Sequence, residues 1–230
     1  MSQYPDARFI LSADAPAHFP PDTGVEVAVA GRSNAGKSSA INVIVNRRQF
    51  ARTSKTPGRT RLVNFFSLRE GQRLVDLPGY GFARVPDEQR EHWGELLQHY
   101  FEGRQSLAGL ILVVDVRRQL TDFDRQMLEF SSFVKLPAHI LLTKADKLKR
   151  GQASRALLEV RQEAGPGASV QLFSATSRQG LDEAREILAA FLRRSGRKKQ
   201  RSVLESGGKS TNMAPKSEKK PRTPQKDVRG

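Results

Sequence analysis

The chain has 230 residues and a formal net charge of +15, from 39 lysines and arginines against 24 aspartates and glutamates. The absence of cysteine and of any run of about 18 apolar residues excludes a disulfide framework and a membrane span. The basic balance favours a polyanionic partner such as nucleic acid, and the first residues lack the basic and apolar parts of a secretion signal, so we expect a cytoplasmic protein.

In chain order, apolar runs alternate with segments of helical periodicity. Strands buried on both faces of a parallel sheet are expected at 25–30, 73–77, 107–115, 138–143 and 170–174. Residues 62–68 turn into 73–77 and predict a hairpin that adds one antiparallel edge strand. Helices are expected at 37–47, 87–102, 122–134, 152–163 and 181–194. The prediction is an α/β, three-layer, doubly wound P-loop fold with a mainly parallel six-stranded sheet.

The last part of the chain has a different composition. Residues 196–230 contain eleven basic and three acidic residues, a net of +8, and almost no apolar ones. Such a segment buries too little surface to fold alone, so we expect a disordered tail from residue 195. Residues 1–22 are interpreted as an N-terminal segment and 23–194 as the folded domain.

A phosphate-binding loop is predicted between the first apolar strand and the first helix. Gly31-Arg-Ser-Asn-Ala-Gly36-Lys37-Ser38 matches G-x-x-x-x-G-K-[ST] in the strand-loop-helix context that this motif requires. Its glycines allow backbone N–H groups to surround phosphate oxygens, and Lys37 adds a full positive charge. Ser38 is expected to ligate Mg²⁺.

Two further motifs follow later strands. Asp76-Leu-Pro-Gly79 ends the second parallel strand, where an aspartate can hold Mg²⁺ through water and a glycine amide can sense the γ-phosphate. Thr143-Lys-Ala-Asp146 favours guanine over adenine, because a carboxylate accepts two hydrogen bonds from guanine N1–H and its exocyclic amine. Lys144 would lie along the base, and Ser174-Ala175 ends the last strand near the expected guanine O6.

The expected hydrolysis chemistry is incomplete. Tyr80 stands where Ras-like hydrolases carry a water-orienting glutamine, and a tyrosine cannot do that work. We therefore expect slow intrinsic hydrolysis that needs a cation or a partner. Asn34 is a candidate K⁺ ligand beside the phosphates, although it could equally stabilise the loop. Thr60 is our choice for a second Mg²⁺ hydroxyl, and spacing alone leaves Thr53 and Thr56 open.

These motifs together strongly resemble the EngB family, also called YihA or YsxC, within the TrmE-Era-like P-loop GTPases. The likeness covers roughly residues 8–194 and includes Tyr80-Gly81 and the 55–60 loop, which GTPases in general do not share. Members are small cytoplasmic GTPases that act in assembly of the large ribosomal subunit and are linked to division and septation. The resemblance therefore implies a Mg²⁺-dependent GTPase, with K⁺ as a further candidate ion and GTP or GDP as its ligand. It also implies that the partner is the large ribosomal subunit or its precursor, and it favours Thr60 for Mg²⁺ beside Ser38. We expect the protein to be a monomer.

The nucleotide contacts that the resemblance implies fall in five segments. They are Gly31, Arg32, Ser33, Asn34, Ala35, Gly36, Lys37 and Ser38; Gly58, Arg59, Thr60, Arg61 and Leu62; Asp76, Leu77, Pro78 and Gly79; Thr143, Lys144, Ala145 and Asp146; and Phe173, Ser174 and Ala175. Among them we assign Lys37, Thr60 and Asn34 to catalysis.

Two other functions fit parts of the pattern. A P-loop kinase would move the γ-phosphate to a small molecule, but the chain shows no acceptor-binding segment and carries a guanine motif. An RNA-binding protein with a vestigial nucleotide site rests on charge alone. The tail is expected to add salt-sensitive RNA affinity, and the alternative is a purely solubilising role.

Overall fold

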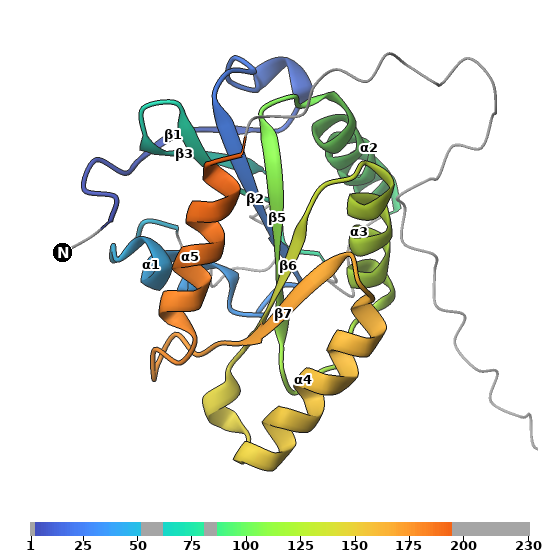
Figure 1. Ribbon diagram of the computed structural model, residues 1–230. Coiled ribbons are helices and arrows are strands. Elements are labelled where there is room, and N and C mark those ends of the chain that lie inside the picture. Colours follow the sequence, from blue (N-terminus) through green and yellow to red (C-terminus); the bar gives the residue numbers. More distant parts are fainter. Residues whose placement is uncertain (1–2, 52–61, 81–86, 195–230) are drawn as a thin grey trace, which may run out of the picture.

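The computed structural model describes residues 3–51, 62–80 and 87–194. These residues form a seven-stranded sheet with the order β1-β3-β4-β2-β5-β6-β7 (Figure 1). Its strands are β1 (Arg8–Ala13), β2 (Val25–Gly31), β3 (Val63–Arg69), β4 (Gln72–Asp76), β5 (Leu107–Asp115), β6 (Ala138–Thr143) and β7 (Ala168–Leu172).

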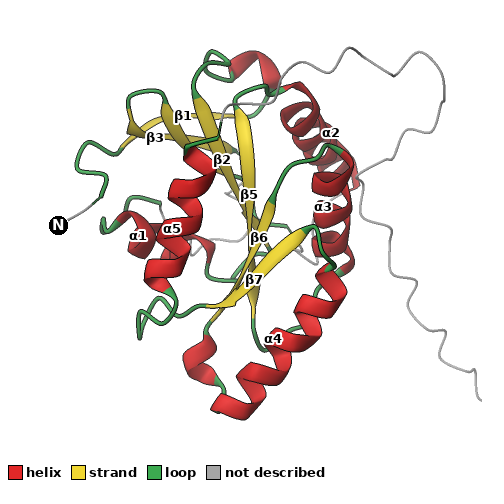
Figure 2. Ribbon diagram, viewed as in Figure 1, coloured by secondary structure: helices red, strands yellow, loops and turns green. Residues whose placement is uncertain are grey.

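Helices cover both faces of the sheet and give it three layers (Figure 2). They are α1 (Lys37–Val45), α2 (Asp87–Gly103), α3 (Asp122–Phe133), α4 (Arg150–Ala164) and α5 (Leu181–Leu192), with short 3₁₀ turns at Pro16–His18 and Ala145–Lys147. One core cluster packs α1 and α5 against one face, and the other packs α2, α3 and α4 against the opposite face. No helix within the described ranges is long and apolar enough to cross a bilayer.

The doubly wound α/β prediction is confirmed, with one correction to the strand count. β2 pairs in parallel with β4 and β5, and β5, β6 and β7 continue in parallel. β3 runs antiparallel to β4, as the hairpin predicted, but it also pairs with β1, so the sheet has seven strands and β1 forms its edge. The sequence did not indicate β1 because its burial shows no strand pattern: Phe9 is 54% and Ile10 39% exposed, while only Ala13 at its end is buried.

The apolar composition of β5 accounts for its central place in the sheet. All nine residues of β5 are buried, because helices cover both of its faces. α3 begins with a capping box in which the Thr121 hydroxyl accepts from the Asp124 N–H while the Asp124 carboxylate accepts from the Thr121 N–H. The chain therefore turns sharply from the carboxyl end of β5 into α3, and it leaves the 116–121 loop beside the ends of β2 and β6.

Candidate functional site

The predicted phosphate loop lies between the end of β2 and the start of α1. Gly36 has φ +98°, a backbone conformation that L side chains rarely adopt, and it precedes Lys37 at the first position of α1. The Ser33 N–H donates to the Tyr80 carbonyl at 2.8 Å, and the Ala35 N–H donates to the Arg32 carbonyl at 3.0 Å. The loop is thus fixed both internally and to the segment that follows β4.

Lys37 and Asp76 form an ion pair between the first two motifs. The lysine ammonium contacts Asp76 Oδ1, and the two side chains are only 11% and 6% exposed. Asp76 is the last residue of β4, which lies next to β2 in the sheet, so adjacent strand ends bring the two charges together. A bound triphosphate would offer Lys37 a stronger anionic partner and would release the Asp76 carboxylate for another contact.

The end of the Asp76–Gly79 segment lies directly against the phosphate loop. The Leu77 N–H donates to the Val29 carbonyl at 3.0 Å, which continues the pairing of β4 with β2. A Cβ on Gly79 would lie 3.4 Å from the Ser33 Cα and N atoms. The backbone after β4 is therefore close enough to the phosphate loop to respond to what that loop binds.

Direct hydrogen bonds join the Thr143–Asp146 segment to the phosphate loop. The Thr143 hydroxyl contacts the carbonyls of Ala35 at 2.5 Å and Val114 at 3.0 Å. The Lys144 ammonium donates to the Asn34 carbonyl at 2.6 Å. The two loops that sequence reasoning assigned to phosphate and to base are thus bonded into one unit.

Asp146 is oriented by the loop after β7. The Ser174 hydroxyl donates to Asp146 Oδ1 at 2.6 Å, and this bond, together with Lys147, lowers the pKa of Asp146. The Ala145 N–H donates to the Phe173 carbonyl at 3.1 Å, which fixes the first loop on the second, and Ala175 follows at the surface of the same turn. The Asp146 side chain is partly exposed, at 19%, and its lowered pKa keeps it charged, which is the state needed to accept hydrogen bonds from a base.

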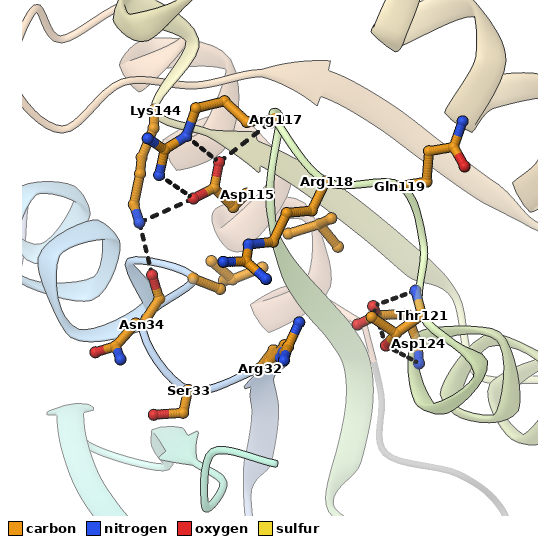
Figure 3. Close-up of a pocket in the computed structure, with 13 residues that line it drawn as sticks. Arg32, Ser33, Asn34, Asp115, Arg117, Arg118, Gln119, Thr121, Asp124 and Lys144 are labelled. Atoms are coloured by element: carbon orange, nitrogen blue, oxygen red, sulfur yellow. Dashed lines mark hydrogen bonds and ion pairs between the residues drawn. The ribbon is translucent and has the colours of Figure 1, made fainter. Parts of the chain in front are cut away.

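Three residues that sequence reasoning did not select lie beside these loops. Arg117 holds Asp115 through two side-chain bonds, Nε to Oδ1 at 2.9 Å and Nη2 to Oδ2 at 2.7 Å. Lys144 pairs with Asp115 Oδ2 at 2.9 Å (Figure 3). Burial alone would raise the pKa of Asp115, but the bonds from Arg117 and Lys144 outweigh it and hold that pKa well below its usual range.

A cavity of about 380 Å³ opens between the phosphate loop and the 116–121 loop, with Arg118 as the third unselected residue (Figure 3). It is lined by Arg32, Ser33, Asn34, Ala35, Val113, Val114, Asp115, Arg117, Arg118, Gln119, Thr121, Asp124 and Lys144.

Tyr80 points into the protein core. It is 5% exposed, its ring stacks on Phe123 with a centroid distance of 3.9 Å, and its hydroxyl donates to the buried Asp124 carboxylate. Burial raises the pKa of Tyr80 well above its ordinary value, and the neighbouring Asp124 raises it further. In this arrangement the tyrosine anchors the segment after β4 to α3.

Some predicted residues lie outside the described ranges. Gly58, Arg59, Thr60 and Arg61 fall there, as do the alternatives Thr53 and Thr56, while Leu62 immediately precedes β3. Within the described part of the chain, no group of three or more histidine, cysteine, aspartate or glutamate side chains could hold a metal ion. Among the described residues, Ser38 in the phosphate loop and Asp76, which contacts Lys37, are the oxygen donors that the sequence motifs assign to Mg²⁺.

Comparisons with known proteins agree with this geometry. A family model described as 50S ribosome-binding GTPase matches residues 26–144. A probable GTP-binding protein EngB from Hydrogenovibrio crunogenus is 54% identical over 183 residues, which cover 78% of this chain and 86% of that protein.

Solved structures show the same fold at lower identity. The crystal structure of a probable GTP-binding protein EngB has a TM-score of 0.59 at 23% identity and covers 74% of this chain and 99% of its own. Era from Aquifex aeolicus, bound to GDP and AlF4−, has a TM-score of 0.56 at 17% identity and covers 75% of this chain and 58% of its own.

Proposed function

The chain belongs to the EngB-type GTP-binding proteins within the 50S ribosome-binding GTPase family, and from this premise we propose that it is a GTP-driven switch in assembly of the large ribosomal subunit. As a member it binds guanine nucleotides and hydrolyses GTP to GDP. We propose further that it works in the cytoplasm as a monomer and that its activity supports normal cell division and septation.

One observation supports guanine recognition above the others. Thr143 and Lys144 bond directly to the phosphate-loop carbonyls of Ala35 and Asn34, while Ser174 orients the Asp146 carboxylate. The hydrogen bonds of Thr143 and Lys144 therefore fix the distance between the phosphate loop and Asp146, where the base would bind. A bound GTP would contact the five segments from Gly31 to Ala175 that the sequence predicted.

We propose Mg²⁺ as the metal cofactor, and the residues present fit it. Ser38 opens α1 beside the phosphate loop, and Asp76 is an oxygen donor that Lys37 neutralises in the structure. Mg²⁺ prefers a few protein oxygens together with phosphates and waters, which agrees with the small protein donor set here. Ser38, with Thr60 from outside the described residues, would hold the ion, and the ion would neutralise charge on the β- and γ-phosphates.

Hydrolysis by this chain alone is proposed to be slow. The buried, bonded Tyr80 side chain supports this, because it offers no group to orient an attacking water. Lys37 and a further cation would compensate the negative charge that develops on the leaving phosphates. Asn34 is proposed as a K⁺ ligand, since it is exposed on the phosphate loop with φ +63° and its side chain is turned to solvent.

The ribosomal part of the proposal rests on the family and on charge. The net charge of +15 suits a ribonucleoprotein partner, whose surface phosphates attract basic proteins. We propose that residues 23–194 form the GTP-binding domain, with 1–22 as an N-terminal segment whose β1 extends the sheet, and 195–230 as a basic tail.

Sedimentation through sucrose tests the switch. Full-length protein in cell extract is expected to sediment with large-subunit particles in the presence of a nonhydrolysable GTP analogue and to leave them with GDP. Lys37→Ala should abolish the difference, whereas Arg150→Ala, which removes an exposed cation on α4, should preserve it. Equal sedimentation with the analogue, with GDP and without nucleotide would exclude the switch, and a preference for ATP over GTP would point to a kinase instead.

A further inference from the structure

The cavity beside the phosphate loop shares part of its lining with the proposed nucleotide contacts, namely Arg32, Ser33, Asn34, Ala35 and Lys144. Its lining includes Asn34 and Lys144 but none of Lys37, Ser38 or Asp146. It opens between the phosphate loop and the loop that leads from β5 into α3 (Figure 3). The opposite wall, which includes Asp115, Arg117 and Arg118, lies outside the proposed nucleotide contacts and is open to another group.

Some of the charged side chains in the cavity are paired with opposite charges, and others are not. Four basic and two acidic side chains line it. Asp115 is already shared between Arg117 and Lys144, and the buried Asp124 carboxylate is bonded to Tyr80 and to Thr121.

Two guanidinium groups, those of Arg32 and Arg118, have no acidic partner among the described residues. Arg32 comes from the phosphate loop and Arg118 from the facing loop, and both side chains enter the cavity (Figure 3). The cavity thus has one such guanidinium group on each of two facing walls. Its two carboxylates, Asp115 and Asp124, are bonded to other residues.

We propose that this cavity binds a phosphate group of RNA, an inference that rests on the ribosomal function proposed above. A guanidinium donates through a planar fork that matches phosphate oxygens, and arginine is a common ligand of the nucleic acid backbone. A cavity of about 380 Å³ admits a phosphate with its bridging waters, each of about 30 Å³, but not the surface of a folded protein. RNA also suits the net charge of the chain.

The placement gives the RNA contact a short path to the nucleotide. Asn34 and Ala35 line the cavity, and their carbonyls accept hydrogen bonds from Lys144 and Thr143. The phosphate group of a bound RNA would therefore touch the same loop that holds the triphosphate. The RNA phosphate and the nucleotide could therefore affect each other's binding through this loop alone.

Fluorescence anisotropy with a short labelled single-stranded RNA tests the proposal on the full-length, GDP-loaded protein. Arg118→Ala should weaken RNA binding about tenfold, as expected for the loss of a charge-assisted contact. It should also lower the slope of log affinity against log salt by about 0.7. Arg118→Lys, which keeps the charge but loses the fork, should retain the slope and only part of the affinity.

Two controls make the result specific. Arg150→Ala removes another exposed cation, on α4, and should leave RNA affinity within twofold of the wild type. It should change the slope of log affinity against log salt by less than Arg118→Ala does. GDP affinity should be unchanged by Arg118→Ala, because Arg118 contacts neither proposed nucleotide loop through its side chain.

The outcomes separate this inference from the proposed function. If wild-type protein binds RNA and large-subunit particles but Arg118→Ala behaves like Arg150→Ala, the cavity is not the RNA site. If Arg118→Ala loses binding to polyglutamate while keeping RNA affinity, the occupant is an acidic protein segment and the proposal is overturned. If wild-type protein binds neither RNA nor ribosomal particles in any nucleotide state, the proposed function itself fails.

Discussion

At the scale of single residues, Lys144 lies between two oxygens that fix its ammonium group. The Asn34 carbonyl accepts from it on one side and Asp115 Oδ2 pairs with it on the other. Arg117 in turn fixes the Asp115 carboxylate through both of its oxygens. Lysine side chains are long and lose considerable entropy when ordered, so a second contact at Asp115 prepares Lys144 for the base before nucleotide arrives.

Asp115→Asn should therefore weaken nucleotide binding without removing a nucleotide contact. The amide keeps the shape of the carboxylate but loses its charge, and a hydrogen bond to a charged group contributes about 1.5–3 kcal/mol. We expect GDP to dissociate roughly tenfold faster, which stopped-flow release of a fluorescent GDP analogue would measure.

A double substitution distinguishes positioning from general destabilisation. In a Lys144→Met background, Asp115→Asn should have little further effect on GDP release, because the side chain it positions is already gone. Arg117→Ala should accelerate release in the same direction, and Arg118→Ala, one residue along the same loop, should not. Additive effects of Asp115→Asn and Lys144→Met would contradict the positioning role.

At the scale of elements, α5 packs so closely on β5 that one strand position must be glycine. A Cβ at Gly109 would lie 2.3 Å from Cδ2 and 2.5 Å from Cγ of the Phe191 ring, which is itself 7% exposed. Gly109→Ala should destabilise the protein by about 1–3 kcal/mol, because the ring or the helix has to shift. Urea unfolding followed by circular dichroism measures the change.

Gly151 in α4 provides the matched glycine. A Cβ there meets nothing within 4 Å. Gly151→Ala should leave the stability nearly unchanged, with a gain below about 0.5 kcal/mol, because Gly151 lies in the first turn of α4, where alanine gains less over glycine than in a helix interior. If both substitutions moved the unfolding midpoint equally, the packing of Phe191 on β5 would not explain the need for Gly109.

His139 makes the junction of β6 and β7 sensitive to acid. Its ring is 1% exposed and lies 2.7 Å from Ser169 Oγ and 2.9 Å from Gln171 Oε1 on the neighbouring strand. Burial lowers the pKa of His139 below its ordinary 6.5, although the Gln171 bond partly opposes this. The unfolded chain therefore binds more protons, and this contribution to stability is lost as pH falls below about 6.5.

The expected result is a steeper loss of unfolding free energy in wild type than in His139→Gln between about pH 6.5 and pH 5. Glutamine keeps hydrogen-bonding groups in place and cannot take up the proton. Parallel curves for wild type and His139→Gln would show that His139 does not titrate on unfolding.

The same elements show what sequence could and could not indicate. The phosphate loop and Asp146 were recognisable because each short motif follows an apolar strand at a fixed spacing. Asp115 was not, since in sequence it is only the last residue of a strand. Its contact with Lys144 depends on the pairing of Asp115 with Thr143 across β5 and β6. Both strands are buried at every position, so no alternation of buried and exposed residues reveals that register.

At the scale of the whole molecule, the two ends of the sheet hold different charged structures. The proposed nucleotide loops occupy the carboxyl ends of the strands, while a buried ionic network occupies the opposite end. Glu26, at the start of β2, is fully buried and bonds to Arg104, Arg73 and Tyr100. Arg104 also donates to the Pro20 carbonyl at 2.7 Å. The network thus joins the N-terminal segment and the end of α2 to the sheet.

Glu26→Ala should destabilise the whole fold by about 3–5 kcal/mol, because it leaves two arginines partly buried without their shared acid. Nucleotide selectivity of the folded protein should be unchanged, since the network lies at the far end of the strands from Asp146. Thermal unfolding and competition between GTP and ATP measure the two quantities separately. If Glu26→Ala lowered the unfolding free energy by less than about 1 kcal/mol, the network would contribute no more than an exposed ion pair does.

More than half of the excess positive charge lies in the last 35 residues of the chain. Residues 196–230 carry +8 of the total +15, so residues 1–195 carry the remaining +7. Each basic residue that neutralises an RNA phosphate releases a counterion, and the resulting affinity falls steeply with salt. Deleting residues 196–230 should weaken RNA binding at low salt and flatten its salt dependence, while GDP affinity stays the same. An unchanged salt slope would assign the tail to solubility alone, and the remaining affinity would then have to come from the domain, where Arg118→Ala tests it.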